Sequence, residues 1–223
     1  MTPERFQKLK QVLTRRQPDL TVLAADVHKP HNISAIFRTC DAVGIHRVHA
    51  VSPGGEFRHH RMASGGTRHW VGLNLHRSLS AAIEVLRTDG WQLIAAHPSE
   101  AAGDFRRIDY TQKTALVLGS ELAGLDELAI READATITIP MQGMVESLNV
   151  SVAAALVLYE AQCQRDRARM YEKSRLDAEE FKATLFEWAY PEIADRLKAR
   201  RQAYPELSDA GELLGNPLRE SDT

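Results

Sequence analysis

The chain has 223 residues, of which 43% are hydrophobic and 26% are charged, and its net charge is −2. This is an ordinary composition for a folded protein, and no stretch is of low complexity. No apolar run approaches the roughly 20 residues that a membrane helix needs, and residues 1–10 contain no apolar signal segment. The two cysteines, Cys40 and Cys163, fall in helical patterns, so we expect a cytoplasmic protein without a disulfide framework.

Apolar periodicity and capping residues predict alternating strands and helices. Residues 3–16 are expected to form an amphipathic helix. After the loop at Pro30, a second helix is expected to begin with Asn32 as its N-cap and to end at Gly44. The other expected elements are strands at 20–25, 47–51, 70–75, 91–96, 114–118 and 136–139, and helices at 79–88, 125–133 and 147–164. This alternation predicts an α/β fold, with a mostly parallel sheet and helices on both faces.

Charge is distributed unevenly over four expected parts of the chain. The helical extension at 1–19 holds five Lys or Arg against two acidic residues, and the α/β domain at 20–164 holds twelve against fifteen. A second helical extension follows at 165–207, where residues 165–201 hold ten basic residues against eight. The acidic tail at 208–223 is expected to be disordered. The basic excess on both sides of the domain indicates either phosphate-backbone binding or solvated helix faces.

The first motif with chemical interest spans residues 32–39. Its apolar stripe consists of Ile33, Ile36, Phe37 and Cys40, and Arg38 lies off that stripe. Arg38 is therefore either a functional cation or a surface residue that pairs with Asp41, an interaction worth only about 0.3–0.5 kcal/mol. Asn32 is either functional or a simple helix cap.

The second motif, residues 118–124, takes a strand directly into a glycine turn and a helix, where ligands bind in open α/β sheets. The spacing of Gly119 and Gly124 does not match a dinucleotide-binding fingerprint, and Glu121 would repel a pyrophosphate. The motif therefore favours a ligand that carries positive charge or is held by backbone amides. Alternatively, Glu121 only complements the helix dipole.

The third motif, residues 139–151, follows a strand with a loop, and Ser147 is expected to begin the long helix as its N-cap. Asn149 would then be a polar residue of the first turn. Small residues follow in this helix, which permits close packing in a core or across a dimer interface. Ser147 and Asn149 are either functional or ordinary helix-start residues.

Together, the three motifs resemble the signature motifs of the SPOUT-class, TrmH-type RNA ribose 2′-O-methyltransferases. The residues that match are Asn32, Arg38, Gly119, Glu121, Gly124, Ser147 and Asn149. Residues 15–22 and 27–32 are also similar to the bacterial enzymes that methylate guanosine 18 in the tRNA D loop. The similarity runs from the N-terminus to about Tyr171 and continues more loosely to about residue 207.

The resemblance implies a C-terminal deep trefoil knot, a homodimer with the active site at the subunit interface, and S-adenosyl-L-methionine as cofactor. No metal or membrane is implied. The implied cofactor-binding residues are Ala96, Gly119, Ile139 and Leu148. The implied catalytic residues are Arg38, Asn32, Glu121, Ser147 and Asn149. Arg38 is then either the base for the ribose hydroxyl, aided by an RNA phosphate, or a protonated group that holds the phosphate and stabilises the alkoxide.

The flanking basic segments are the expected tRNA-binding surface. The candidate residues are Arg5, Lys8, Arg15, Arg16, Arg165, Arg167 and Lys173. Six of the nine histidines fall in residues 46–76. We interpret that segment as an RNA-facing loop rather than a metal site at His59 and His60, because adjacent side chains diverge in a strand and no Cys or carboxylate cluster accompanies them.

Three other functions are compatible with parts of this pattern. A non-catalytic RNA-binding relative would not need the catalytic set, and methyl incorporation separates the two. A nucleotide-dependent oxidoreductase would need a dinucleotide-binding fingerprint, which this sequence lacks. Calorimetric binding of S-adenosyl-L-methionine or of NAD would decide between the two functions. Ribosomal RNA methylation by the same machinery is a third possibility, although those relatives often carry a separate N-terminal RNA-binding domain and this chain has only a short helix there.

Overall fold

The computed structural model describes residues 1–25, 27, 29–54, 69–99, 101–120 and 124–215. The chain folds into two compact units. One runs from Gln17 to Met170, and the other combines Met1–Arg16 with the chain from Tyr171 onward. In the part of the chain that is described, no helix is both long and apolar enough to span a membrane.

The described residues of the Gln17–Met170 unit form a seven-stranded sheet in which every pair of neighbours is parallel. The spatial order is β3-β2-β1-β6-β4-β7-β5. The strands are β1 (Leu20–Ala24), β2 (Arg47–Val51), β3 (Gly72–His76), β4 (Gln92–Ala96), β5 (Gly103–Asp104), β6 (Thr114–Leu118) and β7 (Ala135–Thr138). The expected parallel α/β fold is confirmed, and the short strand β5 was not expected.

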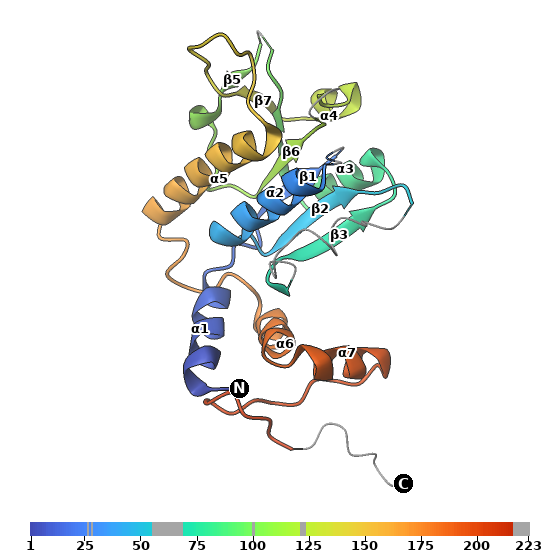
Figure 1. Cartoon of the computed structure of the whole chain (residues 1–223), viewed down its shortest axis with the longest axis vertical. Coiled ribbons are helices and arrows are strands. Elements are labelled where there is room, and N and C mark those ends of the chain that lie inside the picture. Colours follow the sequence, from blue (N-terminus) through green and yellow to red (C-terminus); the bar gives the residue numbers. More distant parts are fainter. Residues whose placement is uncertain (26, 28, 55–68, 100, 121–123, 216–223) are drawn as a thin grey trace. The chain divides into compact units, whose positions relative to one another are not determined.

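Helices cover both faces of this sheet, because its central strands are apolar on both sides. Helices α2 (Pro30–Ala42) and α5 (Val150–Arg167) pack side by side on one face (Figure 1). That face of β1 and β6 presents Leu20, Val22 and Leu116 to them. The alternate residues Leu23 and Val117 belong to the core on the other face. There the sheet packs against α3 (Leu79–Thr88) and α4 (Glu127–Arg131).

The helix starts expected at Asn32 and Ser147 are wrong, and both residues belong to the motifs of chemical interest. Helix α2 begins at Pro30, with Lys29 as N-cap, so Asn32 lies inside the first turn. Proline suits that first position because the missing N–H would have no helical partner there. Helix α5 begins at Val150 and not at Ser147, and Asn149 is its N-cap. The Asn149 side chain accepts a hydrogen bond of 2.8 Å from the Ser151 amide.

The C-terminal part of α5 is fixed by the guanidinium of Arg165, whose side chain is fully buried. Its Nη1 atom lies 2.5 Å from the Asp19 carboxylate and 3.0 Å from Oε1 of Gln17. Its Nε donates to the carbonyl of Tyr110, and Nη2 donates to the carbonyls of Asp19 and Gln112. All five N–H groups of the guanidinium therefore have acceptors, which is what a buried cation requires. This cluster joins α5 to the loops before β1 and β6.

The second unit consists of α1 (Pro3–Thr14), α6 (Ala178–Ala189), α7 (Pro191–Ala199) and the chain that follows. Helix α1 packs on α6 through buried residues that include Phe6 and Leu13. The C-terminal segment lies against α1, since a Cβ atom on Gly211 would come 2.3 Å from the Phe6 ring. The N- and C-terminal helical segments thus form one folded body.

We predict that Arg165→Met lowers the free energy of unfolding by about 3 kcal/mol, because removing one member of a buried ion pair leaves the other charge uncompensated. Urea denaturation at neutral pH measures this change. Arg167→Met is the matched control, since Arg167 lies two residues away on the same helix and is exposed; it should change stability by less than about 0.5 kcal/mol. Equal stability of the two variants would contradict the role assigned to Arg165.

Candidate active site

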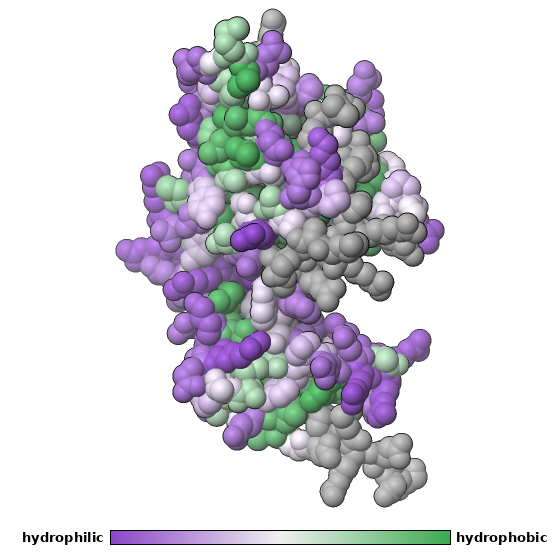
Figure 2. Space-filling model, in the orientation of Figure 1, coloured by the Kyte–Doolittle hydropathy of each residue, from purple (hydrophilic) through white to green (hydrophobic). Residues whose placement is uncertain are grey.

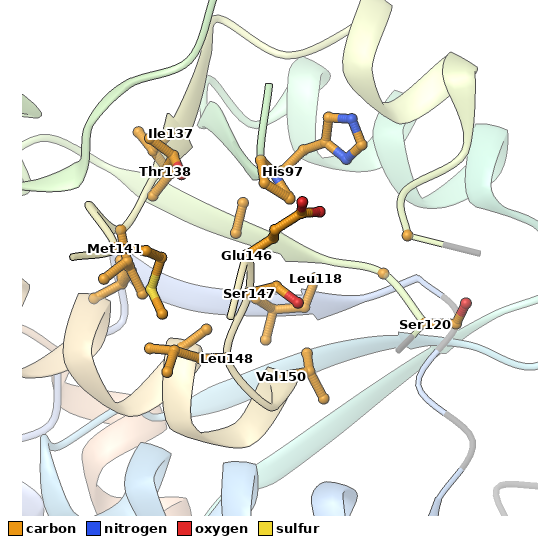
Figure 3. Close-up of a pocket in the computed structure, with 17 residues that line it drawn as sticks. His97, Leu118, Ser120, Ile137, Thr138, Met141, Glu146, Ser147, Leu148 and Val150 are labelled. Atoms are coloured by element: carbon orange, nitrogen blue, oxygen red, sulfur yellow. The ribbon is translucent and has the colours of Figure 1, made fainter. Parts of the chain in front are cut away.

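The carboxyl ends of β4, β6 and β7 surround a cavity of about 180 Å³. All four residues expected to bind a cofactor line it: Ala96, Gly119, Ile139 and Leu148. The loop between β7 and α5 also lines the cavity, through residues that include Met141, Ser147 and Leu148 (Figure 3). Ligands bind at this edge of a parallel sheet because the loops after neighbouring strands meet there.

The turn after β6 is held together by two backbone hydrogen bonds. The Ser120 amide donates to the carbonyl of Gly124 (3.0 Å), and the Gly124 amide donates to the carbonyl of Ser120 (3.1 Å). Gly124 has a φ of +70°, which favours glycine. A Cβ atom on Gly119 would lie 2.1 Å from the Gly124 carbonyl oxygen, so this position has no room for a side chain. Glu121 lies between these residues, outside the described part of the chain.

A hydrogen bond between side chains joins the first motif to the third. The Nδ2 atom of Asn149 donates to Oδ1 of Asn32 over 3.2 Å. Asn32 is 1% exposed, so its amide is a structural part of the α2–α5 contact. Ser147 and Leu148, just before Asn149, line the cavity. The structure therefore brings together three of the five expected catalytic residues: Asn32, Ser147 and Asn149.

Arg38 does not line the cavity. It is exposed on α2 and lines a separate, more open hollow with His31, Ser34 and Ala35. These residues follow the helical spacing of three and four, so they share one face of α2. Within a single chain, the cavity and the Arg38 hollow are thus separate pockets that share no lining residue. The Asn149–Asn32 hydrogen bond joins residues that are next in the sequence to Leu148 of the cavity and His31 of the hollow.

The expected RNA-binding residues fall into two groups. Exposed side chains belong to Arg5, Lys8, Arg15, Arg167 and Lys173. Arg16 and Arg165 are fully buried, which is incompatible with direct phosphate contact in this conformation. The Arg16 guanidinium lies 5.2 Å from the centre of the Trp188 ring, a cation–π contact within the second unit.

Two of the histidines in residues 46–76, His49 and His76, pack against each other. His49 is 6% exposed, its Nδ1 lies 2.9 Å from Nε2 of His76, and the two rings stack. Burial lowers the pKa of His49 to about 4, so this ring is neutral at pH 7. His49 is therefore a packing residue and not an RNA contact. Among the described residues no group of three potential metal ligands occurs, and His59 and His60 lie outside them.

The cavity also contains residues that the sequence did not single out. His97 directly follows Ala96 at the end of β4, and Met141 and Glu146 come from the loop after β7. In Figure 3 the Glu146 side chain points toward the side of the cavity where His97 lies. The signal for His97 and Met141 was present, since each lies one or two residues beyond an expected cofactor residue at a strand end. Nothing in the local pattern indicated Glu146.

The family model described as "SpoU rRNA Methylase family" matches residues 19–159, and its companion, "SpoU, rRNA methylase, C-terminal", matches residues 163–216. The chain belongs to the SpoU methylase family. The expected membership of the TrmH-type methyltransferases is thereby confirmed. The first match covers the sheet and the cavity.

Curated relatives are similar over nearly their whole length. The chain is 48% identical over 215 residues to the tRNA (guanosine(18)-2′-O)-methyltransferase of Escherichia coli, covering 96% of this chain and 94% of that protein. It is 50% identical over 187 residues to the enzyme of the same name from Thermus thermophilus, covering 84% of this chain and 96% of that protein.

Solved structures of the family share the fold. The TrmH/SpoU tRNA modifying enzyme of Aquifex aeolicus matches with a TM-score of 0.79 at 39% identity, covering 85% of this chain and 97% of that one. The SpoU methyltransferase AviRb of Streptomyces viridochromogenes, solved with the cofactor AdoMet, matches with a TM-score of 0.59 at 28% identity. That match covers 69% of this chain and 62% of AviRb.

We predict that Gly119→Ala weakens S-adenosyl-L-methionine binding at least about 10-fold, because the added methyl group must displace the Gly124 carbonyl and the cavity wall behind it. Isothermal titration calorimetry measures the affinity. Gly103→Ala is the control, since its Cβ would meet the Thr136 carbonyl at an ordinary 3.9 Å. An unchanged affinity of Gly119→Ala would show that this turn does not shape the binding site.

Proposed function

We propose that this protein transfers the methyl group of S-adenosyl-L-methionine to the ribose 2′-hydroxyl of guanosine 18 in the D loop of tRNA. The observation that carries the proposal is the cavity at the strand ends, which unites all four expected cofactor residues and is joined to α2 by the Asn149–Asn32 hydrogen bond. The similarity to curated enzymes of this name, at 48–50% identity over most of the chain, supports the same substrate.

The cavity fits S-adenosyl-L-methionine by its chemistry. Its walls are mainly apolar side chains and strand-end backbone, which suit an adenine ring held by backbone groups. Among its described lining residues Glu146 is the one carboxylate, and none is Lys or Arg, so a cationic sulfonium meets no repulsive charge there. When bound, this cofactor supplies an electrophilic methyl group on sulfur.

The chain's own residues then have separate tasks. Gly119, Ile139 and Leu148 shape the cavity, and Ser147 and Asn149 fix the loop that closes it. Arg38 is the cation that holds an RNA phosphate beside the reacting ribose. A fixed cation there also stabilises the alkoxide character of the attacking oxygen. The proposed role of Glu121 is to hold the loop after Gly119.

The tRNA surface is proposed to use the exposed basic side chains of each unit. These are Arg5, Lys8, Arg15 and Lys173 in the unit that holds both ends of the chain, and Arg167 at the end of α5. Arg16 and Arg165 are left out because they are buried. Such contacts to phosphates make affinity strongly dependent on salt. The proposed cytoplasmic location rests on this proposed tRNA substrate.

The test is methylation of tRNA transcripts by the purified protein with labelled S-adenosyl-L-methionine. Nuclease digestion and mass spectrometry should locate one 2′-O-methyl group at guanosine 18, and a transcript with adenosine at that position should stay unmethylated. Arg38→Ala should transfer no measurable methyl while its cofactor affinity changes less than about twofold, since Arg38 does not line the cavity.

The same assay on ribosomal RNA addresses the alternative substrate. A 23S rRNA (guanosine-2′-O-)-methyltransferase of Coxiella burnetii is 36% identical over 154 residues of this chain. Methylation of ribosomal RNA with none on tRNA would replace the proposed substrate. Cofactor binding without transfer to either RNA would indicate a non-catalytic relative.

We also propose that two copies of the chain form a homodimer through α5. One face of this helix exposes Val152, Leu156 and Tyr159, which are 46%, 42% and 54% exposed. The adjoining loop exposes Met144 (98%) and Val145 (61%). Figure 2 shows apolar surface, in green, over the upper part of this unit, where Figure 1 places that loop and the start of α5. Exposed apolar side chains of this kind favour burial against a partner. The C-terminal trefoil knot that the family resemblance implies stays a prediction.

We predict that Leu156→Glu weakens the dimer about 100-fold or more, because a two-fold interface contains each substitution twice and each buries a charge in place of a leucine. Sedimentation velocity over a range of concentrations measures the dissociation. The matched control is Val85→Glu on α3, since Val85 is 43% exposed but lies on another helix. A parent dimer that Leu156→Glu leaves intact would exclude this face.

A further inference from the structure

The cofactor cavity carries one negatively charged side chain among its described lining residues, the carboxylate of Glu146. None of these lining residues is Lys or Arg, and the other titratable side chain among them is His97. The remaining walls consist of apolar side chains, hydroxyl groups and backbone. A charge on walls of low polarity acts strongly on a ligand, because little water or countercharge screens it. The charge of a ligand should therefore affect its affinity for this cavity, and not only its shape.

Glu146 is held beside the cavity by the residues that follow it. Glu146, Ser147 and Leu148 line the cavity in succession, so this stretch of the loop runs along the wall. The next residue, Asn149, is the N-cap of α5 and anchors the end of the loop. Figure 3 shows the Glu146 carboxylate directed toward the part of the cavity where His97 lies. The anchored loop thus keeps this carboxylate close to a ligand that fills the cavity.

The Glu146 carboxylate is also available to a ligand. It forms no hydrogen bond or ion pair with another residue that the structure describes. The carboxylates of Asp104 and Asp134 differ, because they pair with Arg106 and Arg87. A carboxylate that has no protein partner and lies at a cavity wall is suited to pair with a cationic ligand.

The donor and the product of the proposed reaction differ mainly in charge. S-adenosyl-L-methionine carries a sulfonium cation. When the ribose oxygen bonds to the methyl carbon, the carbon–sulfur bond breaks with its electron pair on sulfur and leaves the neutral thioether of S-adenosyl-L-homocysteine. The two molecules share every other group. An uncharged cavity could distinguish them only by one methyl group, whereas a carboxylate in its wall also acts on the charge of the sulfur.

We propose that Glu146 makes the cavity prefer the cationic methyl donor over its neutral product. The inference rests on the function proposed above and adds to it a residue that determines cofactor specificity. The carboxylate attracts the donor through its positive charge, and this attraction ends when the methyl group has left. The product is then held less tightly and exchanges for a new donor molecule. Glu146 takes up no proton in this scheme and forms no bond to the reacting atoms.

Glu146→Gln tests the proposal, because glutamine keeps the size of the side chain and removes its charge. Isothermal titration calorimetry measures the Kd of donor and product for both proteins. The Kd of S-adenosyl-L-methionine should rise about 3- to 10-fold, which corresponds to about 0.7–1.4 kcal/mol. The Kd of S-adenosyl-L-homocysteine should change less than about twofold. The ratio of the two Kd values isolates the charge effect, since the contacts of the methyl group are the same in both proteins.

Two further variants and one further ligand separate charge from loop structure. Glu146→Asp keeps the charge, and its Kd ratio should stay within about twofold of the parent ratio. Glu127→Gln is the matched control, since Glu127 is exposed on α4 and does not line the cavity; its Kd ratio should also stay within about twofold. Sinefungin carries an amine in place of the methylated sulfonium, so its affinity should fall in Glu146→Gln as that of the donor does.

Product inhibition gives a second readout. In methylation assays on tRNA, the ratio of product to donor that halves the rate should be about 3- to 10-fold lower for Glu146→Gln than for the parent, because the variant no longer favours the donor.

The possible outcomes distinguish failure of the inference from failure of the proposed function. If the parent binds neither donor nor product, both are wrong. If the parent binds both but Glu146→Gln leaves the Kd ratio unchanged, the inference is wrong and the function stands. Equal losses of affinity for donor and product would also overturn the inference, because they describe a structural role of Glu146 in the loop.

Discussion

The hydrogen bond from Asn149 to Asn32 is the contact on which the arrangement of the site depends. Asn149 caps α5 through its Oδ1 atom, which also accepts a bond of 2.6 Å from the Ser151 hydroxyl, while its Nδ2 atom reaches α2. One amide thus fixes where the loop after β7 ends and where α5 lies against α2. At the other end, Arg165 holds α5 with five hydrogen bonds. A helix fastened at both ends gives the cavity a rigid wall, which is what precise positioning of a reacting group requires.

The sequence predicted the sheet well because its strands are short apolar runs between turn residues, as in β1 and β6. It failed at the two helix starts for a definable reason. Ser147 and Asn149 are both favourable caps, and local preference cannot rank them. Asn149 is the cap in the structure, where its side chain also has a partner 117 positions earlier in the chain. The same long-range contact buries Asn32, which local preference had placed at a cap. Strand β5 has only Gly103 and Asp104, too few residues for any periodic signal.

Charge patterns were a weaker guide than apolar ones. Arg15 and Arg16 are adjacent in the sequence, yet Arg15 is exposed and Arg16 lies over the Trp188 ring. At the end of α5, Arg165 is likewise buried and Arg167 is exposed. A long cationic side chain can lie in water or in a buried site that offers enough hydrogen-bond acceptors. The residues next to it in the sequence do not determine which of the two occurs. The acceptors of Arg165 come from residues 17–19 and 110–112, far away in the sequence.

The geometry of the turn after β6 argues against a dinucleotide cofactor more strongly than the missing fingerprint does. A pyrophosphate site needs free backbone amides at the start of a helix. Here the amides of Ser120 and Gly124 bond to each other's carbonyls. Helix α4 has only five residues, and its Leu128 amide donates to the Asp126 carboxylate, which occupies the end that an anion would need. The negative charges of Asp126 and Glu127 would also repel phosphate. In the described part of this turn, these contacts disfavour a bound pyrophosphate, and they suit a cationic ligand held by backbone and apolar groups.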